Sequence, residues 1–260
     1  MAIIIEKPRK TKEELKQFLN FINLSTSNLE WCKWAGWTDT DASIQVNMNK
    51  SRRKTPERQE LVKLSLRDRQ PVELLSNFFE TNLLFHQHKT VTPEPYRYHY
   101  IAKQYVTRLY ISRAVCFTKN VYPYLLNDVK KQYAVKLLGY EPESKPLDEW
   151  TKEEFVAYLA TVIEGDGNVE IQKNKNIRNK VHINVRSSDA EYLSKLKYLV
   201  EKFFNAHTNL TEMSTYKTLD GIKTKYRLRI YENLDLYSLL TKPNVMTMDR
   251  KKNKIMEVFN

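Results

Sequence analysis

The sequence predicts an α+β protein in which a single chain carries two half-domains of the same plan. Three observations favour this fold class: an acidic motif that occurs twice, an alternating strand pattern after each copy, and further matches that follow in the same order. The first copy is WAGWTDTDASIQVNMN at residues 34–49, and the second is LATVIEGDGNVEIQKN at residues 159–174.

The acids of the two copies align, with Asp39 on Glu164 and Asp41 on Asp166. Three downstream segments also match: 61–75 with 180–194, 108–111 with 227–230, and 128–138 with 249–259. Several matches in unchanged order rarely arise by chance, so we infer an internal duplication.

Each half begins with a helix that ends at its acidic pair. The strand that follows alternates between apolar and polar residues, as a strand with one buried face does. In the first half the apolar set is Ile44, Val46 and Met48, and the polar set is Gln45, Asn47 and Asn49. A basic tip and a second alternating strand come next, which predicts a hairpin with one wet face.

A second helix is predicted near Pro71 in the first half and near Asp189 in the second, because apolar residues recur there at helical spacing. A further strand pair and a closing helix complete each half. Thr-Lys-Glu-Glu at Thr11 and at Thr151 predicts two capping boxes. The predicted boundaries are an N-terminal extension at 1–26, a first half-domain at 27–138, a proline-rich linker at 139–150 and a second half-domain at 151–260.

The composition favours a polyanionic partner. The 260 residues include 43 Lys and Arg against 31 Asp and Glu, a net charge of +12 that points to nucleic acid first. Cys32 and Cys116 stand far apart, which argues against a disulfide framework and for a reducing compartment. The N-terminal MAIIIEKPRK has an apolar run of only three isoleucines, which is too short for a signal peptide or a membrane span. We therefore expect an intracellular protein that is not secreted.

Small residues in the motif helix predict how the two halves meet. Ala35 and Gly36 let another helix backbone approach closely, and a duplicated protein offers its own copy as the partner. If the two helices pack near a pseudo-two-fold axis, Asp41 and Asp166 emerge together at one end. Such a pair repels unless a cation or a proton intervenes, and Mg²⁺ prefers carboxylate and water oxygens.

The segments WAGWTDTDA and LATVIEGDG resemble the nine-residue motif of the LAGLIDADG homing endonucleases. The hairpins and the two-copy layout extend the resemblance over roughly 27–260. It implies two αββαββα half-domains, with two antiparallel sheets that form a DNA-binding saddle around central motif helices. It also implies a monomer that recognises a long asymmetric target and cuts both strands with Mg²⁺, leaving 3′ overhangs. Mn²⁺ is expected to replace Mg²⁺, and Ca²⁺ to bind without fast cleavage.

The resemblance also implies the site residues. In that family the second acid of each motif binds metal together with the preceding backbone carbonyl, which here gives Asp41 with Thr40 and Asp166 with Gly165. A catalytic lysine and a polar residue accompany the acids. The lysine falls in the repeated DVKK and DRKK segments, where two registers remain open: Asp128 and Asp249 hold its place, or Lys130 and Lys251 serve. The polar counterparts fall near Asp68 and Ser187.

The polar faces of the predicted strands are the candidate DNA-reading surface. Amide, guanidinium and carboxylate groups can recognise base edges in the major groove. The candidates are Gln45, Asn47, Asn49, Lys63, Ser65, Arg67, Arg108, Tyr110, Glu170, Gln172, Asn174, His182, Asn184, Arg186, Arg227, Arg229 and Tyr231. Basic residues at the hairpin tips are expected to meet phosphates instead: Lys50, Arg52, Arg53, Lys175 and Arg178.

Besides an intron-encoded endonuclease, two other kinds of protein are considered: a nucleic-acid binder that does not cut, and an intein endonuclease. The same scaffold could bind nucleic acid without cutting, either as an intron maturase with intron RNA as partner or as a repressor. An intein endonuclease is disfavoured, because the chain starts with Met and ends in EVFN without a splice pair.

Overall fold

The computed structural model describes residues 2–49, 57–91, 99–172, 180–218 and 221–259. The helices are α1 Lys12–Ser25, α2 Asn28–Thr40, α3 Arg69–Phe78, α4 Ser112–Val121, α5 Asp128–Leu138, α6 Lys152–Gly165, α7 Ala190–Phe204, α8 Leu234–Leu240 and α9 Asp249–Met256. The strands are β1 Ala2–Ile5, β2 Ala42–Asn49, β3 Glu57–Leu66, β4 Leu83–Val91, β5 His99–Tyr110, β6 Gly167–Gln172, β7 Lys180–Ser187, β8 Thr208–Thr218 and β9 Gly221–Ile230.

The duplicated plan is present in the structure. One half runs α2-β2-β3-α3-β4-β5-α4, followed by α5, and the other runs α6-β6-β7-α7-β8-β9-α8, followed by α9. The two sheets have the strand orders β1-β4-β5-β3-β2 and β6-β7-β9-β8, with every pairing antiparallel. The predicted α+β fold class with two αββαββα units is therefore confirmed.

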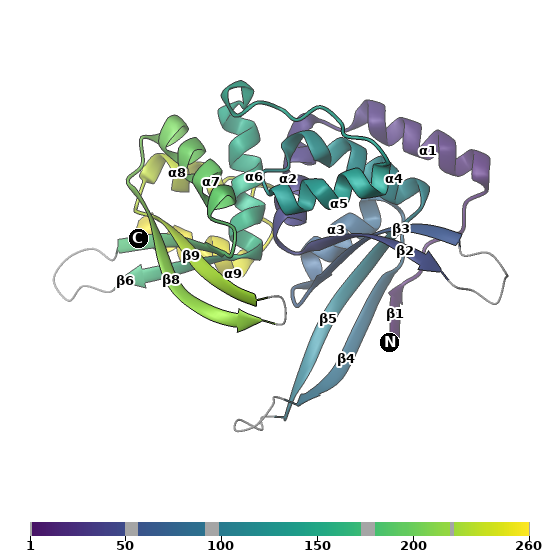
Figure 1. The fold of residues 1–260 in the computed structure, drawn as a ribbon, viewed down its shortest axis with the longest axis horizontal. Helices are drawn as coiled ribbons and strands as arrows, with labels where there is room; N and C mark the ends of the chain where they lie inside the picture. The colour runs from purple at the N-terminus through teal and green to yellow at the C-terminus, as the bar shows by residue number, and fades with distance from the viewer. Residues whose placement is uncertain (1, 50–56, 92–98, 173–179, 219–220, 260) are drawn as a thin grey trace.

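Each sheet has one apolar face and one polar face. On β3 the side chains of Val62, Leu64 and Leu66 are buried beneath helices, whereas Lys63 and Ser65 point to the opposite face. Most helices gather on one side of the two sheets, and the long β4–β5 and β8–β9 pairs extend away from them (Figure 1). The polar faces are thus left open on the side away from the main helical layer.

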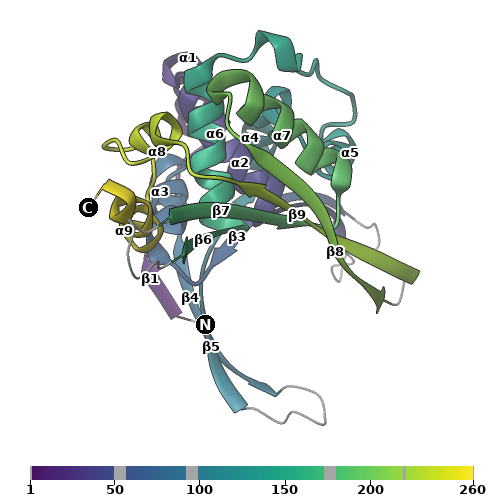
Figure 2. The ribbon, with the colours of Figure 1, turned by 90° about the vertical axis from the view of Figure 1, so that its left-hand side faces the viewer.

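The motif helices α2 and α6 lie side by side between the two sheets in both views (Figure 1, Figure 2). Their close approach depends on Gly36, where an added Cβ would overlap Thr161 Oγ1 and lie 2.5 Å from the carbonyl oxygen of Tyr158. Thr161 fills the matching place on α6 and donates a hydrogen bond to the carbonyl of Lys33 across the contact, at 2.9 Å. The predicted helix-to-helix contact therefore forms, with threonine in the place of a second small residue.

Local signals in the sequence place the helix starts correctly. Both predicted capping boxes are present, at Thr11 with Glu14 and at Thr151 with Glu154. The three tryptophans of α2, Trp31, Trp34 and Trp37, are core residues, and each is at most 4% exposed.

The N-terminal extension is joined to the first half. Its strand β1 pairs with β4 and makes the first sheet five-stranded, and Leu19 and Ile22 of α1 are buried in the core. Cys32 and Cys116 are both free, buried thiols. Within the described residues, no helix has both the length and the apolar character needed to cross a bilayer.

Candidate active site

The two motif acids meet where α2 and α6 end. Asp41 and Asp166 are the C-cap residues of these helices, and β2 and β6 begin at the next residue. A Cβ added at Gly165 would overlap Asp41 Oδ2 and Thr40 Oγ1, so the carboxylate of one half lies directly against the backbone of the other. The helix contact at Gly36 thus brings the two copies of the acid to one place.

The environment of this acid pair favours a bound cation. Asp41 Oδ2 is buried without a hydrogen-bond partner, and burial raises the pKa of Asp41. Asp166 remains exposed at the surface, yet desolvation by the surrounding protein, and then the charge of Asp41, raises its pKa to about 6. A cation between the two carboxylates would relieve both penalties.

The donor set fits a hard divalent cation. Carboxylate oxygens of Asp41 and Asp166 are ligands that Mg²⁺ and Ca²⁺ accept. The carbonyls of Thr40 and Gly165, the other expected ligands, stand one residue before these acids, and that of Gly165 accepts a hydrogen bond from Lys251 Nζ at 3.3 Å. Within the described residues, no group of three or more His, Cys, Asp or Glu side chains could hold a metal. The remaining ligands would have to be water or oxygens of a bound substrate, as is usual for Mg²⁺ sites that act on phosphates.

Lysines from α5 and α9 reach the same helix ends. Lys130 Nζ donates to the carbonyl of Ala42 at 2.6 Å, and Lys251 Nζ donates to the carbonyl of Gly167 at 2.7 Å. Ala42 and Gly167 are the equivalent residues that follow Asp41 and Asp166. Of the two registers that the sequence left open, the structure brings Lys130 and Lys251 to the acids.

The two lysines differ in their surroundings. Lys251 also donates to the carbonyls of Ile163 and Glu164, at 2.8 and 2.5 Å, and burial lowers its pKa to about 8. Lys130 is half-buried, and desolvation lowers its pKa as well. Asp128, the alternative in the first half, instead forms an ion pair with Lys195 at 2.8 Å.

The first acid of each motif has a different task from the second. Asp39 is buried, and its Oδ2 accepts hydrogen bonds from the backbone N–H groups of Leu126 and Asn127, at 2.7 and 3.3 Å. Asn127 in turn caps α5 by accepting from the N–H groups of Val129 and Lys130. Asp39 therefore holds the start of the helix that carries the lysine.

Glu164 repeats this arrangement in the second half. Its carboxylate accepts hydrogen bonds from the backbone N–H groups of Thr247 and Met248 and from the Thr247 hydroxyl, just before α9. Helix α9 then presents Lys251 two residues after its start. The sequence alignment already paired Asp39 with Glu164, but it could not show that both anchor a lysine-bearing helix.

One hydrogen bond to Asp39 comes from the other half of the protein. The hydroxyl of Tyr158, on α6, donates to Asp39 Oδ2 at 2.5 Å. Burial raises the pKa of Asp39 to about 7, against the opposing effect of this hydrogen bond and the two backbone ones. Tyr158 has no equivalent in the first motif, where the aligned residue is Lys33, so the repeat gave no signal for it.

Most residues of the first sheet that were predicted to contact DNA bases lie at the surface of its polar face. Gln45 and Asn47 are exposed on β2, and Lys63 pairs with Arg108 across β3 and β5. Arg67 is exposed just after β3. These side chains share the face that the helices leave open.

In the second sheet, several residues that were predicted to contact DNA bases instead contact one another. Asn184 is buried, donates to Glu170 at 3.1 Å and accepts from Arg229 at 3.0 Å. His182 is also buried and stacks edge-on with Tyr231. Direct contact of these buried side chains with a base would require the network to open.

The remaining residues that were predicted for the site or for DNA binding differ in their surroundings. Glu170, Gln172 and Arg186 are exposed, and Arg227 is half-buried. Asp68 forms an ion pair with Arg250 of the other half at 2.9 Å, and Ser187 accepts from the N–H of Asp189. Lys50, Arg52, Arg53, Asn174, Lys175, Arg178 and the side chain of Asn49 lie outside the described residues.

Comparisons with known proteins agree with this architecture. Residues 153–242 match the family model described as a LAGLIDADG-like domain. The structure of the LAGLIDADG homing endonuclease I-GzeII in complex with its DNA target is similar, with a TM-score of 0.52 at 12% identity over 90% of this chain and 89% of that chain. The homing endonuclease I-WcaI bound to its DNA recognition sequence has a TM-score of 0.50 at 11% identity, over 95% and 94% of the two chains. No curated protein matches the sequence.

Proposed function

We propose that this chain is a site-specific DNA endonuclease of the LAGLIDADG family, because residues 153–242 match the model of a LAGLIDADG-like domain and the chain folds like two-domain homing endonucleases. It would act as a monomer on a long asymmetric duplex and hydrolyse one phosphodiester in each strand, leaving 3′ overhangs. The observation that carries this proposal is the meeting of Asp41 with Asp166, flanked by Lys130 and Lys251, at the end of one helix pair.

The residues of the site suit phosphodiester hydrolysis. Asp41, Asp166 and the carbonyls of Thr40 and Gly165 would hold Mg²⁺, which when bound polarises a phosphoryl oxygen and lowers the pKa of water. Lys130 and Lys251 place positive charge beside the acids, where negative charge on a transferring phosphoryl group grows. The carbonyls that bind their ammonium groups fix the position of this charge.

The open sheet faces suit a DNA duplex. A chain with a net charge of +12 attracts the phosphate backbone, and polar side chains on each sheet can read base edges. The two sheets present different side chains, so we expect an asymmetric target. A palindromic site recovered from a randomised DNA library would contradict this expectation.

A plasmid assay separates the endonuclease from a protein that only binds. Supercoiled plasmid carrying a site selected from such a library is expected to become linear with Mg²⁺ or Mn²⁺, and to stay supercoiled but bound with Ca²⁺. Binding without cutting under all three ions would favour the repressor, and accelerated intron splicing without cutting would favour the maturase. Acids at both metal positions are the observation that favours the nuclease.

Cleavage is expected to depend on pH through Asp166 and Lys251. The pKa of Asp166 is raised to about 6, so its carboxyl gains a proton and loses metal affinity as the pH falls through 6. The pKa of Lys251 is lowered to about 8, so its positive charge is lost above that pH. Single-turnover rates are expected to rise near pH 6 and fall above pH 8. A rate that keeps rising beyond pH 9 would contradict a role for the charged lysine.

Substitution of the first acids is expected to slow one strand at a time. Asp39→Asn weakens the anchor of α5 and Lys130, whereas Glu164→Gln weakens that of α9 and Lys251. Each change is expected to slow cleavage of one strand by about 10–100-fold, the usual effect of losing a group that orients a site residue. The slowed strand differs between the two variants, so nicked plasmid accumulates in both.

Duplexes labelled on one strand or the other measure this directly. Tyr158→Phe removes the hydroxyl that donates to Asp39, and it should slow the same strand as Asp39→Asn. Equal slowing of both strands by all three variants would show that these residues support the fold and not the individual lysines.

A further inference from the structure

A basic hollow lies where the N-terminal segment crosses the end of β5. It has a volume of about 520 Å³. Its lining includes five cations and an exposed aromatic side chain: Lys7, Arg9, Lys10, Arg108, Arg113 and Tyr110. We call this hollow, with these six lining residues, the basic hollow.

The N-terminal segment is held in place at this hollow by main-chain pairing. Strand β1 pairs with β4 at the edge of the first sheet, with Ile3 opposite Leu84 (Figure 1). Just beyond the strand, the backbone N–H of Lys7 donates to Asn82 Oδ1 at 2.9 Å. Among the residues that the structure describes, the second sheet ends at β8 and no strand pairs with β8 as β1 pairs with β4.

The positive charge of the basic hollow is only partly neutralised. Lys10 forms an ion pair with Glu80 at 2.8 Å, and Arg113 Nε donates to the carbonyl of Phe79. Glu6 is the other acid in the lining. Within the described part of the chain, the side chains of Lys7, Arg9 and Arg108 have no ion-pair partner. Three cations therefore remain available to an anionic ligand.

The hollow opens on the polar face of the first sheet. Arg108 pairs with Lys63 on that face, whereas its neighbour Leu109 pairs with Val62 and is buried on the helix side. A duplex that lies across Lys63 and Arg108 would therefore continue toward Lys7 and Arg9. Lysine and arginine at such a position contact phosphates, which adds affinity and fixes register.

We propose that the basic hollow binds the phosphate backbone of the duplex just beyond the base pairs read by the first sheet. The DNA footprint is then longer on the first half-domain than on the second. This inference rests on the proposed function, because the ligand is the same duplex that the active site cuts.

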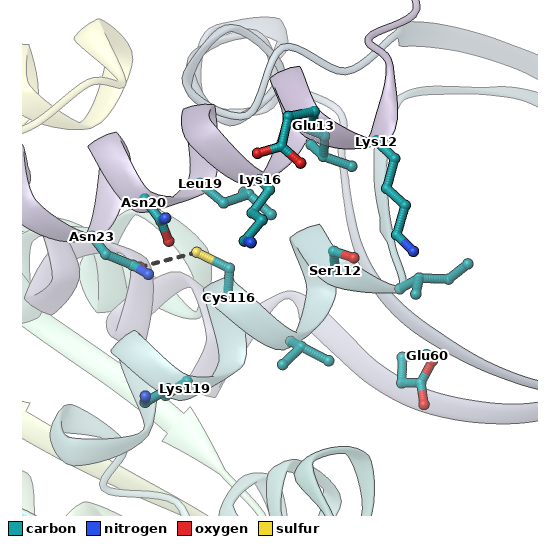
Figure 3. A pocket seen from close by; sticks show the side chains of 13 residues that line it. Lys12, Glu13, Lys16, Leu19, Asn20, Asn23, Glu60, Ser112, Cys116 and Lys119 are labelled. Atoms are coloured by element: carbon teal, nitrogen blue, oxygen red, sulfur yellow. Dashed lines mark hydrogen bonds between the residues drawn. The ribbon is translucent and has the colours of Figure 1, made fainter.

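A second hollow provides the matched control. It lies between α1 and α4 on the helix side, with a volume of about 790 Å³ (Figure 3). Lys12, Lys16 and Lys119 line it together with Glu13 and Glu60. Charges of both signs share this lining, and it faces away from the open sheet surface. Removal of Lys12 and Lys16 changes the net charge by the same amount as removal of Lys7 and Arg9.

The experiment compares Lys7→Ala/Arg9→Ala with Lys12→Ala/Lys16→Ala in the full chain, after thermal unfolding has shown that both variants are folded. The probe is a duplex selected from a randomised library, with long flanks on both sides, bound in Ca²⁺. Loss of two phosphate contacts is expected to weaken binding and lower the slope of log K against log salt by about 2, since each contact contributes about 0.9. The control pair should leave the slope nearly unchanged.

Trimming the flanks then locates the contact. Wild-type affinity should fall when one flank is removed, and the Lys7→Ala/Arg9→Ala variant should be insensitive to the same trimming. Equal salt slopes for both double variants, or equal trimming effects in wild type and variant, would overturn the inference. Wild-type cleavage of the untrimmed site tests the proposed function separately. If the single variants Lys7→Gln and Arg9→Gln fold but keep the full slope, the inference also fails.

Discussion

Asp41→Asn or Asp166→Asn is expected to abolish DNA cleavage while DNA binding persists. Either change removes one of the two carboxylates that meet at the ends of α2 and α6. A metal that stabilises a phosphoryl transition state is worth several kcal/mol, so the cleavage rate should fall by about 10³-fold or more. In the absence of a divalent ion, loss of a negative charge removes repulsion of the DNA polyanion, so affinity measured without metal should stay the same or rise.

Single-turnover cleavage in Mg²⁺ and DNA binding measured without a divalent ion separate the two effects. Asp235→Asn, an exposed acid on α8, is a matched charge control and should cut at the wild-type rate. If both motif variants cut at the wild-type rate, the assignment of the active site is wrong. A loss of binding together with cleavage would show that the acids support the fold.

Gly36→Ala is expected to destabilise the whole protein. The added Cβ would overlap Thr161 Oγ1 and the carbonyl of Tyr158, and the second of these belongs to helix backbone that cannot rotate away. Overpacking of this kind costs about 1–3 kcal/mol, and it outweighs the gain of under 1 kcal/mol in helix propensity. For a chain of this size the melting temperature should fall by about 2–4 °C for each kcal/mol.

A change at the partner helix tests the cause. In a Thr161→Gly background the side-chain overlap disappears, so Gly36→Ala should lower the melting temperature by less, although the clash with the carbonyl remains. Gly165→Ala offers a contrast, because its Cβ would overlap the side chains of Asp41 and Thr40. It should reduce cleavage more than stability. Unchanged melting of Gly36→Ala would mean that the helices can separate without cost.

Much of the fold was predictable because the sequence pattern of one half-domain occurs twice in the chain. The alternation at β2 and β6, the acid pairs and the two capping boxes are local features, and a duplicated order of elements limits how they can be arranged. The small residues at Ala35 and Gly36 also predicted the helix contact, because only a close approach requires them.

The lysine register was not predictable, because DVKK and DRKK contain an acid and lysines within one helical turn. The direction in which α5 and α9 point depends on the anchors at Asp39 and Glu164, which are 87 and 83 residues away from the N–H groups of Leu126 and Thr247. The burial of Asn184 likewise depends on Glu170 and Arg229, from two neighbouring strands. Alternation identifies the face of a strand but not what covers it.

The sequence by itself determined the duplication, the half-domain plan, the acid pair and the cationic character of the chain. Only the tertiary structure decided that Lys130 and Lys251 reach the acids, that Tyr158 ties one half to the other, and that Lys7 and Arg9 join Arg108. The physical reason is that periodicity and capping act between residues close in sequence. Burial and hydrogen bonding between distant segments exist only once the helices and sheets have packed.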